Sequence, residues 1–465
     1  MKDNQNLTRR NFLKTSAVGV VGAFAAPIIV PSSVFGANAP SNRINVGAIG
    51  CGRQGRGVMH SIMDKADARI IAVCDLDANR LADAKTYTEQ TTQQIHKTPH
   101  TGVKMYGNYL ELIADKEIDA VMIATPDHWH AKLAVDAVYA GKDVYLEKPA
   151  SLTVSEGRMM SNIVNSTGRI FQIGSQQRSM AQFRIACELV LNGRIGELKT
   201  IEVEVPGDPS GGETKEMPIP STLNYEAWLG QTPWVYYTED RVHPQQGYGR
   251  PGWLRCEQFG AGMITGWGTH HFDIAHWAMG TEYSGPIEIT AKAAFPARGS
   301  GLWDVHGKFE SEMLYANGVR VFGVEAKEDS PNGEGVVFKG TEGWIYVSRG
   351  NYTATATDPV KAKANNEPLQ ASDSKILKWK PGPNDIQLEV SNDHCRNWLD
   401  AIRSRKPAIT NAEIAHRSCS VCLIQHISMK LNRKLYWDPK NERFKNDDEA
   451  NSMLSRVQRY PYNIS

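Results

Sequence analysis

One stretch near the amino end decides the fold of this chain: Ile44-Asn45-Val46-Gly47-Ala48-Ile49-Gly50-Cys51-Gly52-Arg53-Gln54-Gly55. The apolar run that ends at Ile49 reads as a strand, and the glycines follow it with the spacing G-x-G-x-x-G. Gly50 permits a tight turn, Gly52 lets the backbone approach a pyrophosphate, and Gly55 lets the next helix pack closely on the strand. The stretch therefore predicts a strand, a turn and a helix whose first N–H groups can bind phosphate.

A second expected strand, residues 69–74, ends at Asp75. A carboxylate at that point can accept hydrogen bonds from ribose hydroxyls and repel a 2′-phosphate, which favours NAD over NADP. Arg80 would instead favour NADP, because its guanidinium could reach a 2′-phosphate. A strand–turn–helix that binds nothing stays open as the purely structural interpretation.

Strands alternate with helices after the fingerprint, which predicts a doubly wound parallel sheet of the Rossmann type over residues 40–177. The further elements expected there are strands at 118–124, 142–146 and 170–174 and a helix at 131–139. The pattern then changes to strands separated by turns, at 198–205, 287–292, 311–315, 319–324 and 343–347, with helices at 392–404 and 411–431. Residues 178–465 are therefore expected to form an α+β domain with a mainly antiparallel open sheet.

An export signal is predicted over residues 1–39. It opens with a twin-arginine pattern, Thr8-Arg9-Arg10-Asn11-Phe12-Leu13-Lys14. An apolar segment at 17–30 and small residues at Gly36, Ala37 and Ala39 complete it. An uncleaved anchor is the alternative. Because the twin-arginine machinery moves folded proteins, we expect a periplasmic protein that carries its cofactor across the membrane.

The charge and the cysteines exclude several classes of function. The formal net charge is +1, from 52 basic and 51 acidic residues. The sequence has no long run of like charge, so its charge pattern gives no reason to expect a nucleic-acid partner. The chain has 7 cysteines, without the spacing of a disulfide framework. Cys419 and Cys422 lie in an apolar helical pattern, so they are expected to be buried rather than redox-active or metal-binding.

Three further motifs resemble the Gfo/Idh/MocA family of glucose–fructose oxidoreductases and inositol dehydrogenases. The motifs are Thr125-Pro126-Asp127-His128-Trp129-His130, Glu147-Lys148-Pro149 and Gly268-Thr269-His270-His271-Phe272-Asp273. With the fingerprint, the resemblance covers nearly all of the chain beyond the signal. It implies an enzyme that transfers hydride between NAD and a hydroxyl of a sugar, and a homo-oligomer, dimer or tetramer, that pairs through its open sheet.

The resemblance also implies the site residues. Lys148 would lie between the nicotinamide and the substrate hydroxyl, and His270 would be the general acid/base. The expected cofactor-binding residues are Gly50, Gly52, Arg53, Gln54, Gly55, Asp75, Thr125, Pro126, His130, Glu147, Lys148 and Gln176.

One position departs from the pattern. Gly266 stands where dehydrogenases of the family usually carry an aspartate, which puts simple polyol oxidation in doubt. Asp273, three residues after His270 and on the same helical face, is expected to orient the imidazole instead. His271 is expected to pack. No metal is expected, since His271, Asp273 and His276 have the wrong spacing for shared coordination.

Three functions remain open from the sequence. The first is net oxidation of a sugar or glycoside, and the second is a redox-neutral glycosidase that oxidises, eliminates and reduces at one site. The third is a non-catalytic carbohydrate-binding relic of the fold. Aromatic residues could stack on sugar rings or simply form core: Trp228, Trp234, Tyr236, Tyr237 and Trp253.

Overall fold

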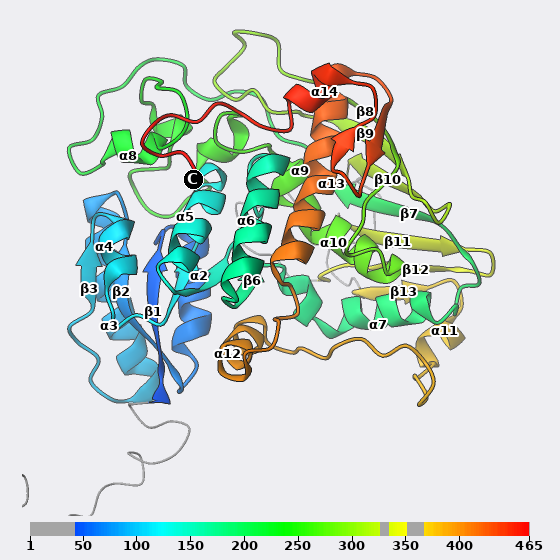
Figure 1. The fold of residues 1–465 in the computed structure, drawn as a ribbon, viewed down its shortest axis with the longest axis horizontal. Helices are drawn as coiled ribbons and strands as arrows, with labels where there is room; N and C mark the ends of the chain where they lie inside the picture. The colour runs from blue at the N-terminus through cyan, green and yellow to red at the C-terminus, as the bar shows by residue number, and fades with distance from the viewer. Residues whose placement is uncertain (1–41, 326–333, 351–366, 465) are drawn as a thin grey trace, which may run out of the picture. The chain divides into compact units, whose positions relative to one another are not determined.

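The computed structural model describes residues 42–325, 334–350 and 367–464. From Ile44 onward the chain forms one compact unit (Figure 1). The predicted export signal, residues 1–39, lies outside the described residues. Among the residues that are described, no helix is both long and apolar enough to cross a bilayer.

The first sheet has six strands in the order β3-β2-β1-β4-β5-β6, and all of its pairs are parallel. Its strands are β1 (Ile44–Ile49), β2 (Ala68–Cys74), β3 (Lys104–Tyr106), β4 (Ala120–Ile123), β5 (Asp143–Leu146) and β6 (Phe171–Ile173). The connecting helices are α2 (Arg53–Met63), α3 (Ala78–His96), α4 (Tyr109–Ala114), α5 (Asp127–Tyr139) and α6 (Val154–Thr167). This order confirms the doubly wound Rossmann sheet. Its switch point lies between β1 and β4, where the carboxyl ends of the strands open a crevice for a ligand.

The start of α5 differs from the prediction. The helix begins at Asp127, four residues before the expected start, and Pro126 is its N-cap with φ −59°. Proline suits a helix start because its fixed φ is helical and its missing N–H is not needed there. The sequence Asp127 to His130 is therefore the first turn of a helix and not a loop.

The second sheet has nine strands in the order β13-β12-β11-β7-β10-β9-β8-β14-β15. These strands are β7 (Leu198–Val205), β8 (Glu288–Ala293), β9 (Phe309–Leu314), β10 (Arg320–Glu325), β11 (Gly335–Gly340), β12 (Trp344–Val347), β13 (Leu369–Ala371), β14 (Leu435–Asp438) and β15 (Arg443–Phe444). The pair of β7 and β10 is parallel and the pairs around it are antiparallel. The mainly antiparallel open sheet is thus confirmed.

Helices cover one face of this sheet. They include α7 (Ala181–Leu191), α10 (Gly268–Met279) and α13 (Ala412–Leu431). Gly323 on β10 faces them, since a Cβ there would lie 3.1 Å from the Phe272 ring. The opposite face carries ion pairs such as Lys339 with Glu202, 2.5 Å apart. The outer face is therefore polar at this position.

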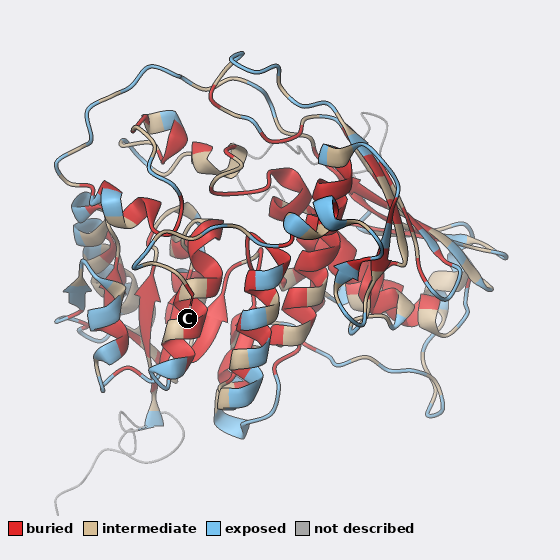
Figure 2. Ribbon diagram, turned by 45° about the horizontal axis from the view of Figure 1, so that its top comes forward, coloured by how far each residue is buried: buried red, intermediate tan, exposed pale blue. Residues whose placement is uncertain are grey.

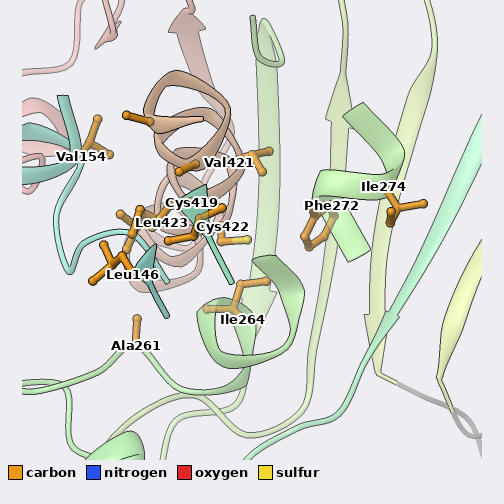
Figure 3. Packing of buried hydrophobic residues seen from close by; sticks show 14 of the residues in the cluster. Leu146, Val154, Ala261, Ile264, Phe272, Ile274, Cys419, Val421, Cys422 and Leu423 are labelled. Carbon is orange, nitrogen blue, oxygen red and sulfur yellow. The ribbon is translucent and has the colours of Figure 1, made fainter. Parts of the chain in front are cut away.

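The core lies where the two sheets meet around α13. Figure 2 shows buried residues concentrated on the central strands and helices, with exposed residues along the outer helices. In Figure 3, Cys419, Cys422 and Leu423 of α13 pack in one cluster with Leu146 and Ile264. Both thiols are free and buried, which confirms the structural interpretation of these cysteines. Because α13 packs against both sheets, it fixes the position of the crevice in the first sheet relative to the second sheet.

The remaining described helical segments are short connections or surface elements. They are the 3₁₀ turns at Gln176–Ser179, Glu239–Arg241 and Gly252–Arg255, together with α8 (Tyr225–Leu229), α9 (Met263–Gly266), α11 (Ser374–Lys378), α12 (His394–Ser404) and α14 (Asp448–Ser452).

Candidate active site

A cavity of about 1380 Å³ opens at the switch point of the first sheet. Its walls combine the fingerprint and the ends of β1, β4 and β5 with residues 243–270 from the second half of the chain. The volume exceeds the usual range of about 300–1000 Å³ for small-molecule pockets. The cavity is therefore large enough for a dinucleotide together with a second molecule.

The fingerprint glycines adopt the expected geometry. Gly50 has φ +83°, a conformation that favours glycine, and a Cβ there would lie 2.6 Å from the carbonyl oxygen of Ala124. A Cβ on Gly55 would lie 2.1 Å from the carbonyl oxygen of Gly50. Gly52 caps α2 without any side-chain hydrogen bond to the helix. The first N–H groups of α2 therefore face the cavity side uncapped, as phosphate binding requires.

Asp75 lies at the end of β2 and lines the same cavity. Its Oδ2 accepts a hydrogen bond of 2.9 Å from the backbone N–H of Cys51, and its Oδ1 accepts one of 3.1 Å from Asp77. These bonds hold the carboxylate against the glycine turn. Its place beside the fingerprint fits the predicted contact with ribose hydroxyls.

Residues 243–250, which we call the strap, contact α3 and its N-cap beside this half of the cavity, and His243, Gly249 and Arg250 line it. The guanidinium of Arg80 donates to the carbonyl oxygens of Pro244 and Gly247, at 2.9 and 3.4 Å. His243 lies 3.2 Å from Asp77, and the Tyr248 hydroxyl donates to Asp83. Arg80 is thus engaged by the strap, which weakens the argument that it reads a 2′-phosphate.

The ends of β4 and β5 bring the second motif to the cavity. His130 bridges the two loops, since its Nδ1 lies 2.6 Å from the Pro149 carbonyl and its Nε2 2.9 Å from that of Thr125. Burial lowers the pKa of His130 to about 4, and the two carbonyl contacts oppose this effect. The Thr125 hydroxyl is buried and has no hydrogen-bond partner among the described residues. Together with Pro126 it lines the cavity, where a bound cofactor could accept its proton.

Glu147 forms a small polar cluster behind this wall. Its carboxylate accepts a hydrogen bond of 2.8 Å from Gln176 and is also hydrogen-bonded by Gln54. Burial raises the pKa of Glu147 and the nearby Lys148 opposes that rise. A Cβ on Gly174 would lie 2.6 Å from the same carboxylate. Glu147 is therefore clamped in place, and Gln54 and Gln176 share the cavity wall with Arg53.

Lys148 and Gly266 connect the two halves of the site. The Lys148 ammonium donates a 2.8 Å hydrogen bond to the carbonyl oxygen of Gly266 in α9. Burial lowers the pKa of Lys148, and the carboxylates of Glu147 and Asp127 oppose this effect. Burial therefore favours the neutral amine of Lys148 more than at a solvated surface lysine, and a neutral amine can accept a proton.

His270 lines the cavity with Lys148, while His271 does not. The Nδ1 of His270 is buried and has no hydrogen-bond partner among the described residues, and its ring packs edge-on against Trp267. Burial, with the charges of Arg349 and Lys148, holds the pKa of His270 well below its usual value. His271 instead lies 2.6 Å from Glu334 and 3.0 Å from the carbonyl oxygen of Glu204. The division between a site histidine and a packing histidine is as the sequence predicted.

Comparison with known proteins agrees with this geometry. Residues 44–175 match a family described as "Oxidoreductase family, NAD-binding Rossmann fold". Residues 210–372 and 384–464 match its "C-terminal alpha/beta domain". The chain belongs to the Gfo/Idh/MocA oxidoreductase family. Its first domain is therefore an NAD-binding domain, and the glycine cradle, Asp75 and the orphaned Thr125 hydroxyl fit that cofactor.

Two relatives of this Gfo/Idh/MocA protein match part of its sequence. A glycosyl hydrolase family 109 protein of Shewanella pealeana is 32% identical over 32% of this chain and 35% of its own length. Inositol 2-dehydrogenase 2 of Saccharopolyspora erythraea is 28% identical over 56% of this chain and 59% of its own length. The chain thus matches less than two thirds of either relative.

Solved structures share the fold of this family member. The WlbA dehydrogenase of Bordetella pertussis, in complex with NADH and UDP-GlcNAcA, has a TM-score of 0.59 at 16% identity, with 85% of this chain and 99% of that chain covered. A levoglucosan dehydrogenase in complex with NADH and L-sorbose has a TM-score of 0.59 at 17% identity, over 85% and 98% of the two chains.

Asp273 does not orient the imidazole, so that part of the prediction is wrong. Its two oxygens accept hydrogen bonds of 2.7 and 2.8 Å from Arg178, and Oδ1 accepts a third of 2.7 Å from Ser418. Arg178 and Asp273 are both about 1% exposed, and Asp273 does not line the cavity. Lying on the same helical face as His270 does not bring Asp273 into contact with the imidazole, because a buried arginine from outside the helix hydrogen-bonds to the carboxylate.

The structure adds residues that the sequence did not single out for a role. Asp127 and Arg349 both line the cavity, and Arg349 lies over the Trp267 ring at 4.7 Å. Of the predicted aromatics, Trp228 and Trp253 line the cavity, whereas Trp234 is 61% exposed. Within the described ranges, no group of three His, Cys, Asp or Glu residues is arranged to hold a metal ion.

Proposed function

We propose that the protein oxidises a hydroxyl of a sugar or glycoside by hydride transfer to NAD that stays bound. The observation that carries the proposal is the meeting of Lys148 and His270, from opposite halves of the chain, in the cavity that the fingerprint opens. NAD supplies the hydride acceptor when it is bound. The named relatives and structures of sugar dehydrogenases support a carbohydrate substrate.

The chain's own residues handle the proton of the substrate. Lys148 can accept the hydroxyl proton as a neutral amine, because burial disfavours its ammonium form. His270 is neutral and its buried Nδ1 has no hydrogen-bond partner among the described residues, so the ring can serve as a second donor or acceptor. Trp253 lines the cavity and offers a flat apolar wall of the kind that stacks on sugar rings, whereas the Trp228 ring is buried and stacks on Tyr225.

A redox-neutral glycosidase is the second candidate. In that reaction the same residues would oxidise a glycoside, the aglycone would leave by elimination, and the hydride would return to the product. Two observations favour it: a relative that is named a glycosyl hydrolase, and Gly266 in place of a side-chain carboxylate beside Lys148. A third candidate, a carbohydrate-binding relic, would keep the cavity without turnover.

Location and assembly are separate proposals. The Thr8–Lys14 pattern before a cofactor-binding fold supports export of the folded, loaded protein to the periplasm by the twin-arginine machinery. Replacing Arg9 and Arg10 by lysine should then keep the protein in the cytoplasm, as cell fractionation would show. We also propose a dimer or tetramer, to be measured by light scattering; a monomer at micromolar concentration would contradict it.

One experiment separates the three candidate functions. Purified protein is first denatured, and the supernatant is assayed for NAD and NADP. Native protein is then incubated with a panel of glycosides while the absorbance of bound NADH and the release of aglycone are recorded. NADH without aglycone indicates net oxidation, aglycone without lasting NADH indicates the glycosidase, and neither signal with any glycoside indicates the relic.

A further inference from the structure

The part of the cavity wall that comes from the second half of the chain is basic. Arg250 and Arg349 both line the cavity, together with Lys148 from the end of β5. Of the described residues after position 200 that line it, Asp393 is the one acid, and its carboxylate lies 2.5 Å from the Lys65 ammonium of α2. The wall beside Lys148 therefore carries more positive than negative charge.

Arg349 is held beside His270. Its guanidinium lies over the Trp267 ring at 4.7 Å, and the same ring packs edge-on against the His270 imidazole. In the amide orientation that satisfies both of its ends, Gln177 accepts a 3.1 Å hydrogen bond from the Arg349 Nε and donates one of 3.1 Å to the carbonyl oxygen of His270. A guanidinium has five donors in a planar fork, so protein groups can fix one edge while a ligand binds at another.

Arg250, at the end of the strap, reaches α9. Its Nη2 lies 2.9 Å from the sulfur of Met263, and a Cβ on Gly266 would lie 3.7 Å from the same sulfur. A thioether is a weak acceptor, so this contact positions the guanidinium without balancing its charge. Because the carbonyl oxygen of Gly266 accepts the Lys148 N–H and Arg349 lies over Trp267, three basic side chains meet around residues 263–267.

Carboxylates behind the wall balance part of this charge. The charges of Glu334 and Arg349 act on each other, as do those of Asp208 and Arg250. Glu334 also lies 2.6 Å from His271, and neither carboxylate lines the cavity. These acids can hold the arginines in place, but they do not occupy the space into which a substrate would enter.

The acids that act on Lys148 in the cavity wall are Glu147 and Asp127. Burial raises the pKa of Asp127 to about 8, which favours its uncharged form at neutral pH. Burial is also the largest cause of the lowered pKa of Lys148, and the charges of Arg349 and Arg250 add to it. An anion bound beside the two guanidinium groups would offset this accumulation of positive charge.

We propose that Arg349 and Arg250 bind a carboxylate of the substrate, so that the sugar oxidised at this site is a hexuronic acid or its glycoside. A carboxylate can accept two parallel N–H groups from one guanidinium, which gives both affinity and orientation. Arg349 and Arg250 are then specificity-determining residues, while Lys148 and His270 handle the hydroxyl proton. The inference rests on the proposed oxidoreductase function, whereas binding of the carboxylate can be measured without turnover.

Calorimetric titration of the full-length holoenzyme tests the site. The cofactor is present as NADH, so that no hydroxyl is oxidised and the fingerprint turn is occupied. The probes are the methyl glycosides of glucuronic, galacturonic and mannuronic acid, each beside the neutral hexoside that differs from it only at C6. We expect at least one uronide to bind about 10–100-fold more tightly than its neutral partner, as a hydrogen bond to a charged group typically provides. Equal affinity in every pair, or no binding of any uronide, would overturn the proposal.

Substitutions then assign the preference to the arginines. Arg349→Gln should reduce the ratio of uronide to hexoside affinity about tenfold or more, and Arg250→Gln should also lower it. Arg349→Lys should keep part of the ratio, since the charge remains without the planar fork. Arg194→Gln is the matched control, because Arg194 also lies over a tryptophan ring, that of Trp379 at 4.9 Å, but does not line the cavity.

A ratio that survives both Arg349→Gln and Arg250→Gln would contradict the assignment. If neither variant folds, the wild type still provides a test: added salt should lower the affinity for the uronide and leave that for the neutral hexoside unchanged. Equal salt dependence of the two affinities would overturn the proposal.

The proposed function and this inference fail differently. If a uronide binds preferentially but neither NADH nor aglycone is released from any glycoside, the proposed function fails and the carboxylate site stands. If neutral glycosides are oxidised with the same kcat/KM as the matching uronides, the acidic substrate is overturned and the proposed function stands.

Discussion

The ammonium nitrogen of Lys148 lies 2.8 Å from the carbonyl oxygen of Gly266. This bond ties the end of β5 to α9, so the position of the lysine depends on both halves of the chain. The acceptor that α9 offers to the Lys148 N–H is thus a backbone carbonyl and not a side-chain carboxylate. Burial is the largest cause of the lowered pKa of Lys148, and a carbonyl stabilises an ammonium less than a full negative charge would.

Loss of either proton-handling residue should lower turnover far more than cofactor binding. We expect Lys148→Ala and His270→Ala each to reduce kcat about 10²–10⁴-fold. The double variant should lose little more, because both residues act on one proton path. His271→Ala is the control: it should weaken folding by leaving Glu334 without its partner, with kcat per folded molecule retained. An active His270→Ala beside a dead His271→Ala would contradict the assignment.

Asp75 should set the preference for NAD. Replacing it by alanine removes hydrogen bonds to the ribose and should cost about 1–3 kcal/mol of NAD binding, with less loss for NADP. Equilibrium titration with both dinucleotides gives the ratio. Arg80→Ala should not raise NADP affinity further, because the Arg80 guanidinium is engaged by the strap at Pro244. An unchanged ratio in Asp75→Ala would show that another residue reads the ribose.

Local sequence pattern predicted five strands of the first sheet but missed its edge strand β3 and some of its helices. The strands around the fingerprint were predicted because each is a short apolar run bounded by turn residues. Helix α3 was not, since Ala84 and Thr88 are its only residues that are buried. The apolar stripe of α3 is too narrow to produce a helical period in the sequence. Part of the stability of α3 comes from its N-cap Asp77, whose side chain accepts hydrogen bonds from the backbone N–H groups of Asn79 and Arg80.

Site residues that lie in sequence motifs could be predicted, whereas contacts between segments far apart in the sequence could not. Gly50, Lys148 and His270 each sit in a recognisable pattern, and the structure brings all of them to one cavity. The error at Asp273 came from considering one helix alone, since its partner Arg178 lies 95 residues away. The contacts of the strap with Asp77 and Arg80 could not be predicted for the same reason, because the sequence of the strap does not indicate which residues it will contact.

Asp273 should matter for folding and not for chemistry. Its pair with Arg178 is almost completely buried, and removing one partner of such a pair costs about 3–5 kcal/mol. We expect Asp273→Asn to lower the urea midpoint while kcat per folded molecule is retained. Ser418→Ala, which removes only the third hydrogen bond to Asp273, should cost less. A stable Asp273→Asn variant without activity would restore a catalytic role.

Buried histidines should make the protein less stable in mild acid. Burial lowers the pKa of His128 to about 3 and holds those of His130, His276, His306 and His394 at about 4. Below pH 6.5 the unfolded chain binds more protons than the folded one, so the free energy of unfolding must fall as pH falls.

The size of this effect can be measured by urea unfolding between pH 7 and 5. Each such histidine contributes up to about 1.4 kcal/mol per pH unit. His394→Gln keeps a donor for the carbonyl oxygen of Ile173 and should remove one residue's share of the slope. Equal slopes in wild type and His394→Gln would contradict the prediction.

Gly266→Asp should change the chemistry of the site most selectively. The nearest contact of a Cβ at Gly266 would be the Met263 sulfur, at 3.7 Å, so the backbone accepts a side chain there. The added carboxylate would lie beside Lys148 and favour its ammonium form. An opposite charge at such a distance shifts a pKa by about 1–3 pH units, so the pH limb of oxidation that reports Lys148 should move up. Gly266→Ala separates the effect of charge from that of size.

If the missing carboxylate distinguishes net oxidation from redox-neutral cleavage, Gly266→Asp should raise the yield of NADH relative to released aglycone, and Gly266→Ala should not. The same ratio and pH limb in both variants would show that the carbonyl of Gly266, and not the lack of a carboxylate, sets the behaviour of Lys148.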